Sequence, residues 1–467
     1  MKPRTSLALV LLALLALGVV LFWERGLPGT DERRERRGML LPDVDAEGVE
    51  RIAVVRDGET LALEKADEDW WLREPIEDRA DRYRVEQLIR DLIEAEVTGR
   101  IAADRVQGGD EATGLGDGAV RIELSGAEAS ADVEIGARRV PGGLRYARLA
   151  GDDRLALVRE RLTETLSVTV QGLRDKTLVS ASTVDMRRLV VERSGERFLE
   201  LVRGGTPEHG ESWRLVHPIE DAADRGRVTT LLSELVALRA DAFVDVSPAE
   251  DAGLDPADWR FVVELAEDDG EQTDGRVVEI ALGREAVDGS GLRFASISNR
   301  EALFEVMADA LLALLSRPLE SFRSMMALDL TTWDVAEVEI TRAGDTLTVA
   351  RVDDEFDPES KWRAVSPAGF PLDAAAFDRT LSELARIEAK RLADDVSREK
   401  AGLVEPVAML TLRYEDALAR PPVTLEIGGP AGAGEVFARR SGRATTLVIE
   451  QELATKIDTS RIRRDPS

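Results

Sequence analysis

Apolar and polar residues alternate with a period of two over many short stretches of this chain. The stretch VERIAVVRDGETLALEK alternates on both sides of Asp57-Gly58. An Asp-Gly pair between two alternating runs is typical of a β-hairpin, so this stretch predicts two antiparallel strands. Similar alternation occurs in AVRIELSG, DWRFVVELAEDDG and VAMLTLRYED. The pattern therefore predicts antiparallel sheet along much of the sequence.

A second pattern has helical spacing and occurs three times. In each case an aspartate is followed by apolar residues that fall on one stripe of a helix. The stripes are Val85, Ile89 and Leu92 after Asp81; Val228, Leu232 and Leu235 after Asp224; and Phe377, Leu381 and Leu384 after Asp373. A carboxylate at the start of a helix accepts hydrogen bonds from its first free N–H groups. We therefore interpret the three aspartates as helix caps rather than as catalytic residues.

These aspartates end a motif, W-x4-P-x5-D, that recurs without a gap. Its positions are Trp70, Pro75 and Asp81; Trp213, Pro218 and Asp224; and Trp362, Pro367 and Asp373. Proline has no N–H to give to a sheet, so it should end the strand that carries the tryptophan. We interpret the tryptophans as core anchors. A platform that stacks on carbohydrate is the alternative.

Each copy of the motif continues in the same order, with a Gly-Leu pair and then a strand that ends in glycine. These positions are Gly114-Leu115 and Gly136; Gly253-Leu254 and Gly283; and Gly402-Leu403 and Gly428. Such repetition predicts three modules, at residues 44–180, 181–330 and 331–460, with a basic tail at 461–467. An antiparallel sheet with a helix on one face in each module would make the fold class α+β.

Residues 1–23 predict a transmembrane anchor. Lys2 and Arg4 precede an uncharged apolar run over residues 7–23, which reaches the lower end of the roughly 17–25 residues that span a bilayer. A signal peptide cleaved near Ala16-Leu17-Gly18 is the alternative, but an intact span would place Trp23 at the headgroups. Residues 24–43 predict a basic tether containing glycine and proline. The charges on the two sides of the run leave the orientation open.

Composition narrows the chemistry. The net charge is −28, with no cysteine and two histidines. So acidic a chain is a poor nucleic-acid binder, and without cysteine it has no disulfide or thiolate metal site. Neither histidine lies in a metal-binding or Ser/His/Asp spacing, and no phosphate-binding loop is present. We therefore expect no catalytic, cofactor-binding or metal-binding residues, and no cofactor.

Two pairs of adjacent carboxylates need a separate interpretation. Two of the motif copies share Pro-Ile-Glu-Asp, which gives Glu77 with Asp78 and Glu220 with Asp221, whereas the third has Ala-Gly-Phe after its proline. Paired carboxylates bind hard cations or divide acid and base roles at some sites. We interpret them here as a solvated turn, since adjacent carboxylates on an exposed turn need no partner.

The motif W-x4-P-x5-D, with a V-x-x-I strand before it and an apolar run at the amino terminus, resembles the bacterial domain-of-unknown-function family 4340. Members of that family look like membrane-anchored envelope proteins found beside gliding-type ABC transport systems. The resemblance implies a single-pass protein of the inner membrane, with the bulk of the chain periplasmic or otherwise extracytoplasmic. It implies no catalytic residues.

The leading hypothesis is a non-enzymatic accessory or scaffold subunit of an ABC-type transport or gliding-associated envelope complex. Its expected partners are the membrane, through residues 7–23, and the ABC permease and ATPase subunits. The alternative is an anchored extracytoplasmic protein that binds a cell-wall polymer or another ligand. An enzyme ranks third, because so few nucleophile and base candidates stand together.

Overall fold

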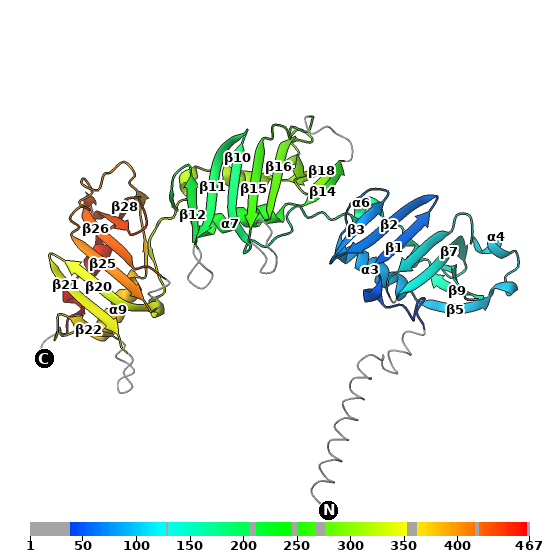
Figure 1. Ribbon diagram of the computed structural model, residues 1–467, viewed down its shortest axis with the longest axis horizontal. Helices are drawn as coiled ribbons and strands as arrows, with labels where there is room; N and C mark the ends of the chain where they lie inside the picture. The colour runs from blue at the N-terminus through cyan, green and yellow to red at the C-terminus, as the bar shows by residue number, and fades with distance from the viewer. Residues whose placement is uncertain are drawn as a thin grey trace, which may run out of the picture. The chain divides into compact units, whose positions relative to one another are not determined.

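The computed structural model describes residues 38–127, 129–204, 212–244, 251–266, 276–352, 362–415 and 420–464. The chain divides into two compact units, Met1–Lys176 (unit 1) and Thr177–Ser467 (unit 2) (Figure 1). Strands make up most of the regular structure in both units, and the paired strands that the structure describes are antiparallel.

The described residues of unit 1 form one nine-stranded sheet, sheet 1, in the order β4-β3-β2-β1-β6-β7-β8-β9-β5. The hairpin predicted at Asp57-Gly58 is confirmed: β1 pairs with β2 from Arg56 opposite Glu59, and both turn residues have positive φ. The strands are β1 Arg51–Arg56, β2 Glu59–Ala66, β3 Asp69–Glu74, β4 Asp78–Arg79, β5 Val97–Ala102, β6 Val120–Ser125, β7 Ser130–Val140, β8 Leu144–Leu149 and β9 Arg154–Arg159.

In unit 2, the described residues form two large sheets. Sheet 2 has nine strands in the order β13-β12-β11-β10-β15-β16-β17-β18-β14, and sheet 3 has eight in the order β22-β21-β20-β25-β26-β27-β28-β24. The strands of sheet 2 are β10 Met186–Arg193, β11 Glu196–Gly204, β12 Ser212–His217, β13 Asp221–Ala222, β14 Ala240–Val244, β15 Trp259–Leu265, β16 Val277–Glu285, β17 Leu292–Ile297 and β18 Arg300–Met307.

Sheet 3 is accompanied by a short strand pair, β19 with β23. The strands of sheet 3 are β20 Val335–Arg342, β21 Asp345–Arg351, β22 Trp362–Ser366, β24 Arg391–Leu392, β25 Ala408–Tyr414, β26 Val423–Gly432, β27 Glu435–Arg440 and β28 Leu447–Glu450. The short pair consists of β19 Met326–Asp329 and β23 Arg386–Glu388.

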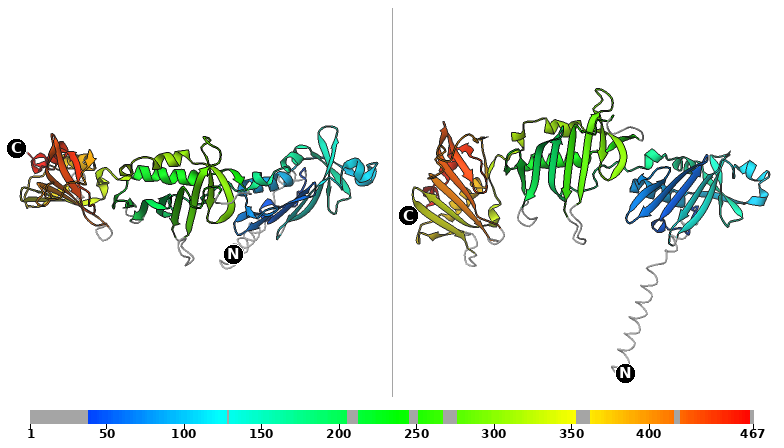
Figure 2. Two further views of the ribbon diagram at one scale, coloured as in Figure 1. Left: turned by 90° about the horizontal axis from the view of Figure 1, so that it is seen from above. Right: turned by 45° about the horizontal axis from the view of Figure 1, so that its top comes forward.

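One longer helix accompanies each large sheet, and each buries its apolar stripe. These helices are α3 Arg82–Ile93, α7 Arg225–Ala237 and α9 Ala374–Leu384 (Figure 2). Shorter helices are α4 Gly109–Thr113, α5 Arg161–Thr165, α6 Val170–Leu173, α8 Asp309–Leu315 and α10 Gln451–Lys456, with 3₁₀ turns at η1 Ala46–Gly48, η2 Ala103–Arg105, η4 Leu319–Phe322, η5 Thr332–Asp334 and η6 Thr459–Ile462.

The predicted fold class is wrong. The sequence predicted an α+β chain of one N-terminal transmembrane helix followed by three repeated modules, each an antiparallel sheet with a helix. Among the described residues the architecture is mostly antiparallel sheet with helices as a minor part, and the compact units are two. The physical reason lies in unit 2, where sheets 2 and 3 share a buried polar contact described below.

The predicted anchor, residues 1–23, and most of the tether, residues 24–43, lie outside the described residues, which begin at Gly38. Within the part of the chain that the structure describes, no helix has both the length and the apolar character needed to cross a membrane.

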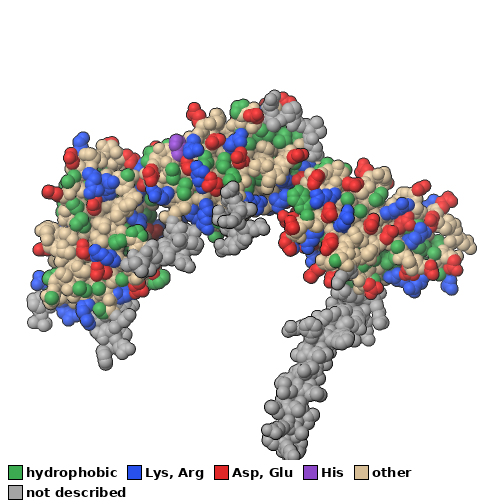
Figure 3. Space-filling view, viewed as in Figure 1, with side chains coloured by type: hydrophobic (Ala, Val, Ile, Leu, Met, Phe, Trp, Pro, Cys, Tyr) green, Lys and Arg blue, Asp and Glu red, His purple; other side chains and the backbone are tan. Residues whose placement is uncertain are grey.

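Each sheet has its own hydrophobic core. In unit 2, one core contains buried residues from Leu178 to Phe322 and another from Ala327 to Ile462. Side chains of opposite sign alternate over the face shown in Figure 3. A smaller buried cluster of unit 2 contains Ala252, Leu254, Ala257, Ala281 and Phe294.

Candidate functional site: a buried ion-pair network and a cavity

The three motif tryptophans are buried. Trp70 on β3, Trp213 on β12 and Trp362 on β22 are 2%, 7% and 3% exposed. Their rings pack within three separate hydrophobic cores. Burial removes the alternative of a carbohydrate-stacking platform, because such a platform must be exposed to its ligand.

The motif prolines and aspartates mark the ends of elements. Pro75, Pro218 and Pro367 each follow the last residue of a strand, and the peptide bond before each is cis. Asp81, Asp224 and Asp373 are the N-caps of α3, α7 and α9. Their Oδ1 atoms accept from the backbone N–H groups of Arg84, Arg227 and Ala376 at 3.2, 2.8 and 2.9 Å.

The paired carboxylates do not form solvated turns, contrary to the sequence interpretation. Asp78 and Asp221 are buried, at 6% and 3% exposure, and each opens a two-residue strand. Their neighbours Glu77 and Glu220 have side chains that are 71% and 72% exposed. Because successive side chains of an extended segment point to opposite faces, each pair is split into one outward and one inward carboxylate.

Asp221 is the centre of a buried network in unit 2. Its Oδ2 accepts from Arg323 Nε at 2.9 Å, Arg443 Nη2 at 3.0 Å and Thr445 Oγ1 at 2.9 Å. Its Oδ1 accepts from Arg443 Nε at 2.8 Å and from the Ala222 N–H at 2.8 Å. The Asp221 and Arg323 side chains are 0% and 1% exposed, and that of Arg443 is 4% exposed. We call Asp221, Arg323, Arg443, Thr445 and Asp394 the Asp221 network.

The network joins the two sheets of unit 2. Asp221 belongs to sheet 2, whereas Arg443 and Thr445 lie between β27 and β28 of sheet 3. Arg323 Nη2 also donates to Asp394 Oδ1 at 2.8 Å and to Thr445 Oγ1 at 2.7 Å. Two arginines and two aspartates balance in charge, so the carboxylate of Asp221 is buried with both its charge and its lone pairs satisfied.

The electrostatics of the network follow from this pairing. Burial alone would raise the pKa of Asp221, but the hydrogen bonds and charges of Arg443 and Arg323 outweigh it and lower that pKa. The hydrogen bond from Arg323 likewise lowers the pKa of Asp394. Arg323 is held charged, because the hydrogen bond to Asp394 raises its pKa. A carboxylate held ionised in this way is a poor general base or acid at neutral pH.

A related pair occurs in unit 1, and its counterpart near sheet 3 differs. Arg174 Nε donates to Asp78 Oδ2 at 2.7 Å, with side chains 2% and 5% exposed. Near sheet 3, the Arg463 guanidinium instead lies 5.9 Å from the centroid of the Phe370 ring. The sequence held a signal for these arginines, since each follows an apolar residue at the end of its segment: Leu173-Arg174, Phe322-Arg323 and Ile462-Arg463.

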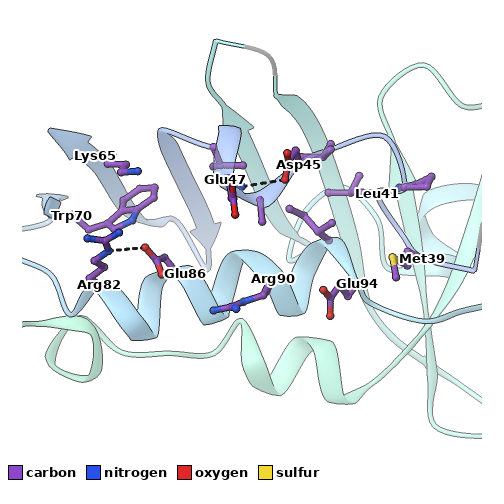
Figure 4. Close-up of a pocket in the computed structure, with 15 residues that line it drawn as sticks. Met39, Leu41, Asp45, Glu47, Lys65, Trp70, Arg82, Glu86, Arg90 and Glu94 are labelled. Atoms are coloured by element: carbon purple, nitrogen blue, oxygen red, sulfur yellow. Dashed lines mark hydrogen bonds and ion pairs between the residues drawn. The ribbon is translucent and has the colours of Figure 1, made fainter. Parts of the chain in front are cut away.

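A cavity of about 570 Å³ lies in unit 1 between α3 and the segment around η1 (Figure 4). Leu41 donates its N–H to the Ile93 carbonyl, and Val97 donates to the Gly38 carbonyl, so backbone hydrogen bonds attach this segment to the end of α3 and the start of β5. The cavity is lined by Met39, Leu41, Pro42, Val44, Asp45, Ala46, Glu47, Val49, Lys65, Trp70, Arg82, Glu86, Arg90, Ile93 and Glu94. Its size is that of a small-ligand site.

Within the ranges that the structure describes, no group of His, Asp and Glu side chains is arranged to hold a metal ion. His217 is half-buried at the end of β12, and His209 falls outside the described residues. The two candidate sites among the described residues are therefore the Asp221 network and the cavity of unit 1.

Among known proteins, the chain matches one family model. No curated protein and no solved structure matches the chain. The model of one family, described as a domain of unknown function (DUF4340), matches residues 70–257, 213–360 and 362–463, which together span well over half of the sequence. The resemblance inferred from the W-x4-P-x5-D motif is thus confirmed, and this chain belongs to the DUF4340 family.

Proposed function

We propose that this protein is a non-enzymatic accessory or scaffold subunit of an ABC-type transport or gliding-associated envelope complex. The observation that carries the proposal is the Asp221 network, in which a fully buried carboxylate connects one sheet of unit 2 to the other. Removing either partner of such a pair is costly, so the contact fixes one arrangement of the two sheets. A scaffold subunit that keeps its partners at fixed positions needs such a rigid connection between its own sheets.

In this proposal the partners are the permease and ATPase subunits of the complex. The bulk of the chain lies on the periplasmic or extracytoplasmic side of the inner membrane, and the apolar residues 7–23 associate with that membrane. The interspersed charges of Figure 3 suit contacts with protein surfaces, where complementary charge sets register and specificity.

Co-purification from detergent-solubilised membranes of the native host tests the proposal. We expect a tagged full-length chain to recover a permease and an ATPase subunit. Asp221→Asn should reduce that recovery, whereas Asp394→Asn, which changes a half-exposed carboxylate of the same network, should keep it. Circular dichroism and the amount of membrane-bound chain control for unfolding. Recovery of the wild-type chain alone would contradict the proposal.

The side of the membrane is tested separately. An alkaline-phosphatase reporter fused after residue 460 is active only when it is exported. We expect activity, with a cytoplasmic β-galactosidase fusion at the same position as the matched control. Full-length fusion protein without phosphatase activity would refute the extracytoplasmic assignment.

A second candidate function is an extracytoplasmic binding protein for a cell-wall polymer or another ligand, and the cavity of unit 1 favours it. Sedimentation of the purified chain with isolated wall material distinguishes the two candidates. Retention by the wall favours the binding protein, and absence of retention together with recovery of transporter subunits favours the accessory subunit.

A further inference from the structure

Sheet 3 lacks the short edge strand that follows the tryptophan strand in sheets 1 and 2. The two-residue strands β4 and β13 pair with β3 and β12 and form the edges of their sheets. In sheet 3 the outermost described strand on this side is β22 itself (Figure 1). A very short edge strand is one way in which proteins protect a sheet edge from other chains. Among the described residues, β22 therefore presents an unprotected edge.

The backbone of β22 lacks a hydrogen bond that the edge strand supplies elsewhere. In sheet 2, the Trp213 carbonyl accepts from the Ala223 N–H at 3.0 Å, and sheet 1 has the same bond. In sheet 3, the N–H of the equivalent Leu372 donates to the Phe370 carbonyl at 2.9 Å instead. In the described part of the chain, the Trp362 carbonyl is thus left without the bond that its counterparts accept at this edge.

The sequence of the third motif copy explains the difference. Phe370 stands where sheet 2 has Asp221, and Pro371 follows it. Proline has no N–H and fits poorly in a strand. Gly369 has a φ of +80° in a turn that the Phe370 N–H closes by donating to the Pro367 carbonyl at 3.3 Å. The connection after β22 therefore turns instead of pairing with the strand.

The arginine that meets the edge-strand carboxylate is nevertheless retained in the third copy. Arg323, which pairs with Asp221, forms a backbone bridge to Ala223, and Arg463 forms the equivalent bridge to Leu372. Arg463 is exposed, and it forms no ion pair with the residues that the structure describes. This edge thus keeps a cation whose carboxylate is missing from the described ranges.

The edge of β22 is also accessible and positively charged. Ala364 in the middle of β22 is half-buried, whereas the equivalent Leu215 of β12 is 1% exposed. Val365 is 55% exposed, and Arg464 adds a second exposed arginine beside Arg463. An extended segment with a carboxylate would gain main-chain hydrogen bonds from the strand and a charge-assisted contact with an arginine.

We propose that an extended acidic segment of a partner protein adds to β22 as a further strand of sheet 3. It takes the place of β4 and β13, runs antiparallel to β22, and directs one aspartate or glutamate toward Arg463. A second copy of this chain offers no such segment in the described ranges, because its two Glu-Asp strands are already paired within sheets 1 and 2. The inference goes beyond the accessory-subunit proposal and does not depend on it, since it specifies a sheet edge and a partner segment and requires no transporter.

Isothermal titration calorimetry of the full chain tests the proposal with the peptide Pro-Ile-Glu-Asp-Ala-Ala, acetylated and amidated at its ends, which has the sequence of residues 218–223. We expect saturable one-to-one binding. Asparagine in place of the peptide's aspartate should weaken binding about tenfold, because one charge-assisted hydrogen bond is lost. N-methyl groups on that aspartate and on the last alanine should abolish binding, because N–H groups two residues apart face the same neighbouring strand.

Variants of the protein locate the binding. Arg463→Gln should weaken it about tenfold. Arg317→Gln, which changes an exposed arginine after α8 beside the core of sheet 2, should leave it unchanged. A loop variant gives sheet 3 the edge sequence of sheet 2 through four substitutions: Ala368→Ile, Gly369→Glu, Phe370→Asp and Pro371→Ala. This variant supplies its own edge strand and should not bind the peptide. Circular dichroism checks that it folds.

Four outcomes would overturn the inference. They are no saturable binding up to about 1 mM, the weak end of specific association; equal binding of the asparagine or N-methylated peptide; equal binding by the folded loop variant; and a wild-type chain that light scattering shows to be dimeric, with the dimer lost in the loop variant. The last outcome would assign the edge to a second copy. Arg463→Gln changes an exposed side chain, so it keeps the test decisive if the loop variant does not fold.

Discussion

At the scale of single residues, Trp70 and Trp362 occupy the same motif position but differ in the hydrogen bonding of their indole N–H groups. Both rings are buried, but Trp362 has a carboxylate acceptor and Trp70 has none among the described residues. A buried donor without a partner costs about 1–3 kcal/mol, whereas a satisfied one contributes about 1 kcal/mol. The same substitution should therefore have different effects at the two positions.

We predict that Trp362→Phe destabilises the protein by about 2–4 kcal/mol more than Trp70→Phe does, because the first change loses a satisfied hydrogen bond and the second removes an unsatisfied donor. The loss of ring volume is the same at both sites, so the difference reports the pairing of the two indole N–H groups. Urea unfolding followed by circular dichroism measures both free energies of unfolding. Equal losses at the two positions would show that the indole N–H groups contribute alike.

The Asp221 network provides a second residue-scale prediction. Asp221→Asn leaves Arg443 buried without its counter-charge and leaves Arg323 with Asp394 alone, which should cost about 3–5 kcal/mol. Asp394→Asn affects a side chain that is 51% exposed and should cost no more than about 1 kcal/mol. Chemical denaturation of the two variants gives the comparison. A smaller loss for Asp221→Asn than for Asp394→Asn would contradict the geometry.

The pH dependence of this network has a definite sign. The folded-state pKa values of Asp221 and Asp394 are lowered, the first because Arg443 and Arg323 outweigh the effect of burial and the second chiefly by Arg323. Their stabilisation is therefore complete above the unfolded-state pKa of about 3.9 and is lost as pH falls through the lower folded-state pKa.

We expect the difference in unfolding free energy between wild type and Asp221→Asn to be constant from about pH 7 to pH 5 and to shrink below about pH 4. Denaturation curves of both proteins across this range provide the measurement. A difference that grows as the pH falls would mean that the aspartate pKa is raised on folding.

At the scale of elements, the strand glycine of each motif copy lies against the backbone of the segment that contains the Gly-Leu pair of the same copy. A Cβ on Gly283 of β16 would lie 2.1 Å from the Ala252 carbonyl oxygen, and one on Gly136 of β7 would lie 2.3 Å from that of Thr113. Gly428 of β26 is in the same position relative to Ala401, at 2.1 Å. Each glycine thus lets the segment around the Gly-Leu pair cross its strand at backbone distance.

We predict that Gly283→Ala destabilises the protein by about 1–3 kcal/mol, because the new methyl group meets backbone that cannot rotate away. Gly204→Ala is the control. Its Cβ would lie 3.8 Å from the nearest atom, an ordinary contact, and its effect should stay within about 0.5 kcal/mol. Thermal or urea unfolding compares them, and equal effects would argue against the close crossing.

At the scale of the whole molecule, the described residues of unit 2 include two large hydrophobic cores and a polar contact between their sheets. Apolar burial supplies most of the stability of each core, since it is proportional to the area removed from water. The Asp221 network adds directional contacts that fix how sheets 2 and 3 meet. The unit therefore combines non-directional cores with a specific joint.

We predict that the two cores of unit 2 unfold together in the wild type and separately in Asp221→Asn. Hydrogen exchange measured at increasing urea concentration reports opening in residues 178–322 and 327–462 individually. The wild type should show one midpoint for both regions, and Asp221→Asn should show two. One shared midpoint in both proteins would mean that contacts other than the network couple the cores.

The amino-acid sequence by itself determined the features that depend on neighbours along the chain. Alternation predicted the hairpin at Asp57-Gly58, and the spacing of apolar residues after Asp81, Asp224 and Asp373 predicted buried helix stripes with aspartate caps. The W-x4-P-x5-D motif also identified the family. Such features follow from backbone geometry and local hydrogen bonds, so a short window of sequence contains their cause.

Only the tertiary structure decided which distant side chains meet. Asp221 and Arg443 lie 222 positions apart in the chain. The residues around Asp221 in the sequence do not indicate its burial, since a Glu-Asp pair also suits an exposed turn. The antiparallel fold turned one carboxylate inward and brought an arginine of another sheet to it. The Trp70 N–H likewise has no partner among the described residues, while the nearby Glu86 carboxylate accepts from Arg82. Long-range charge pairing is set by the packing of whole sheets, which no local pattern encodes.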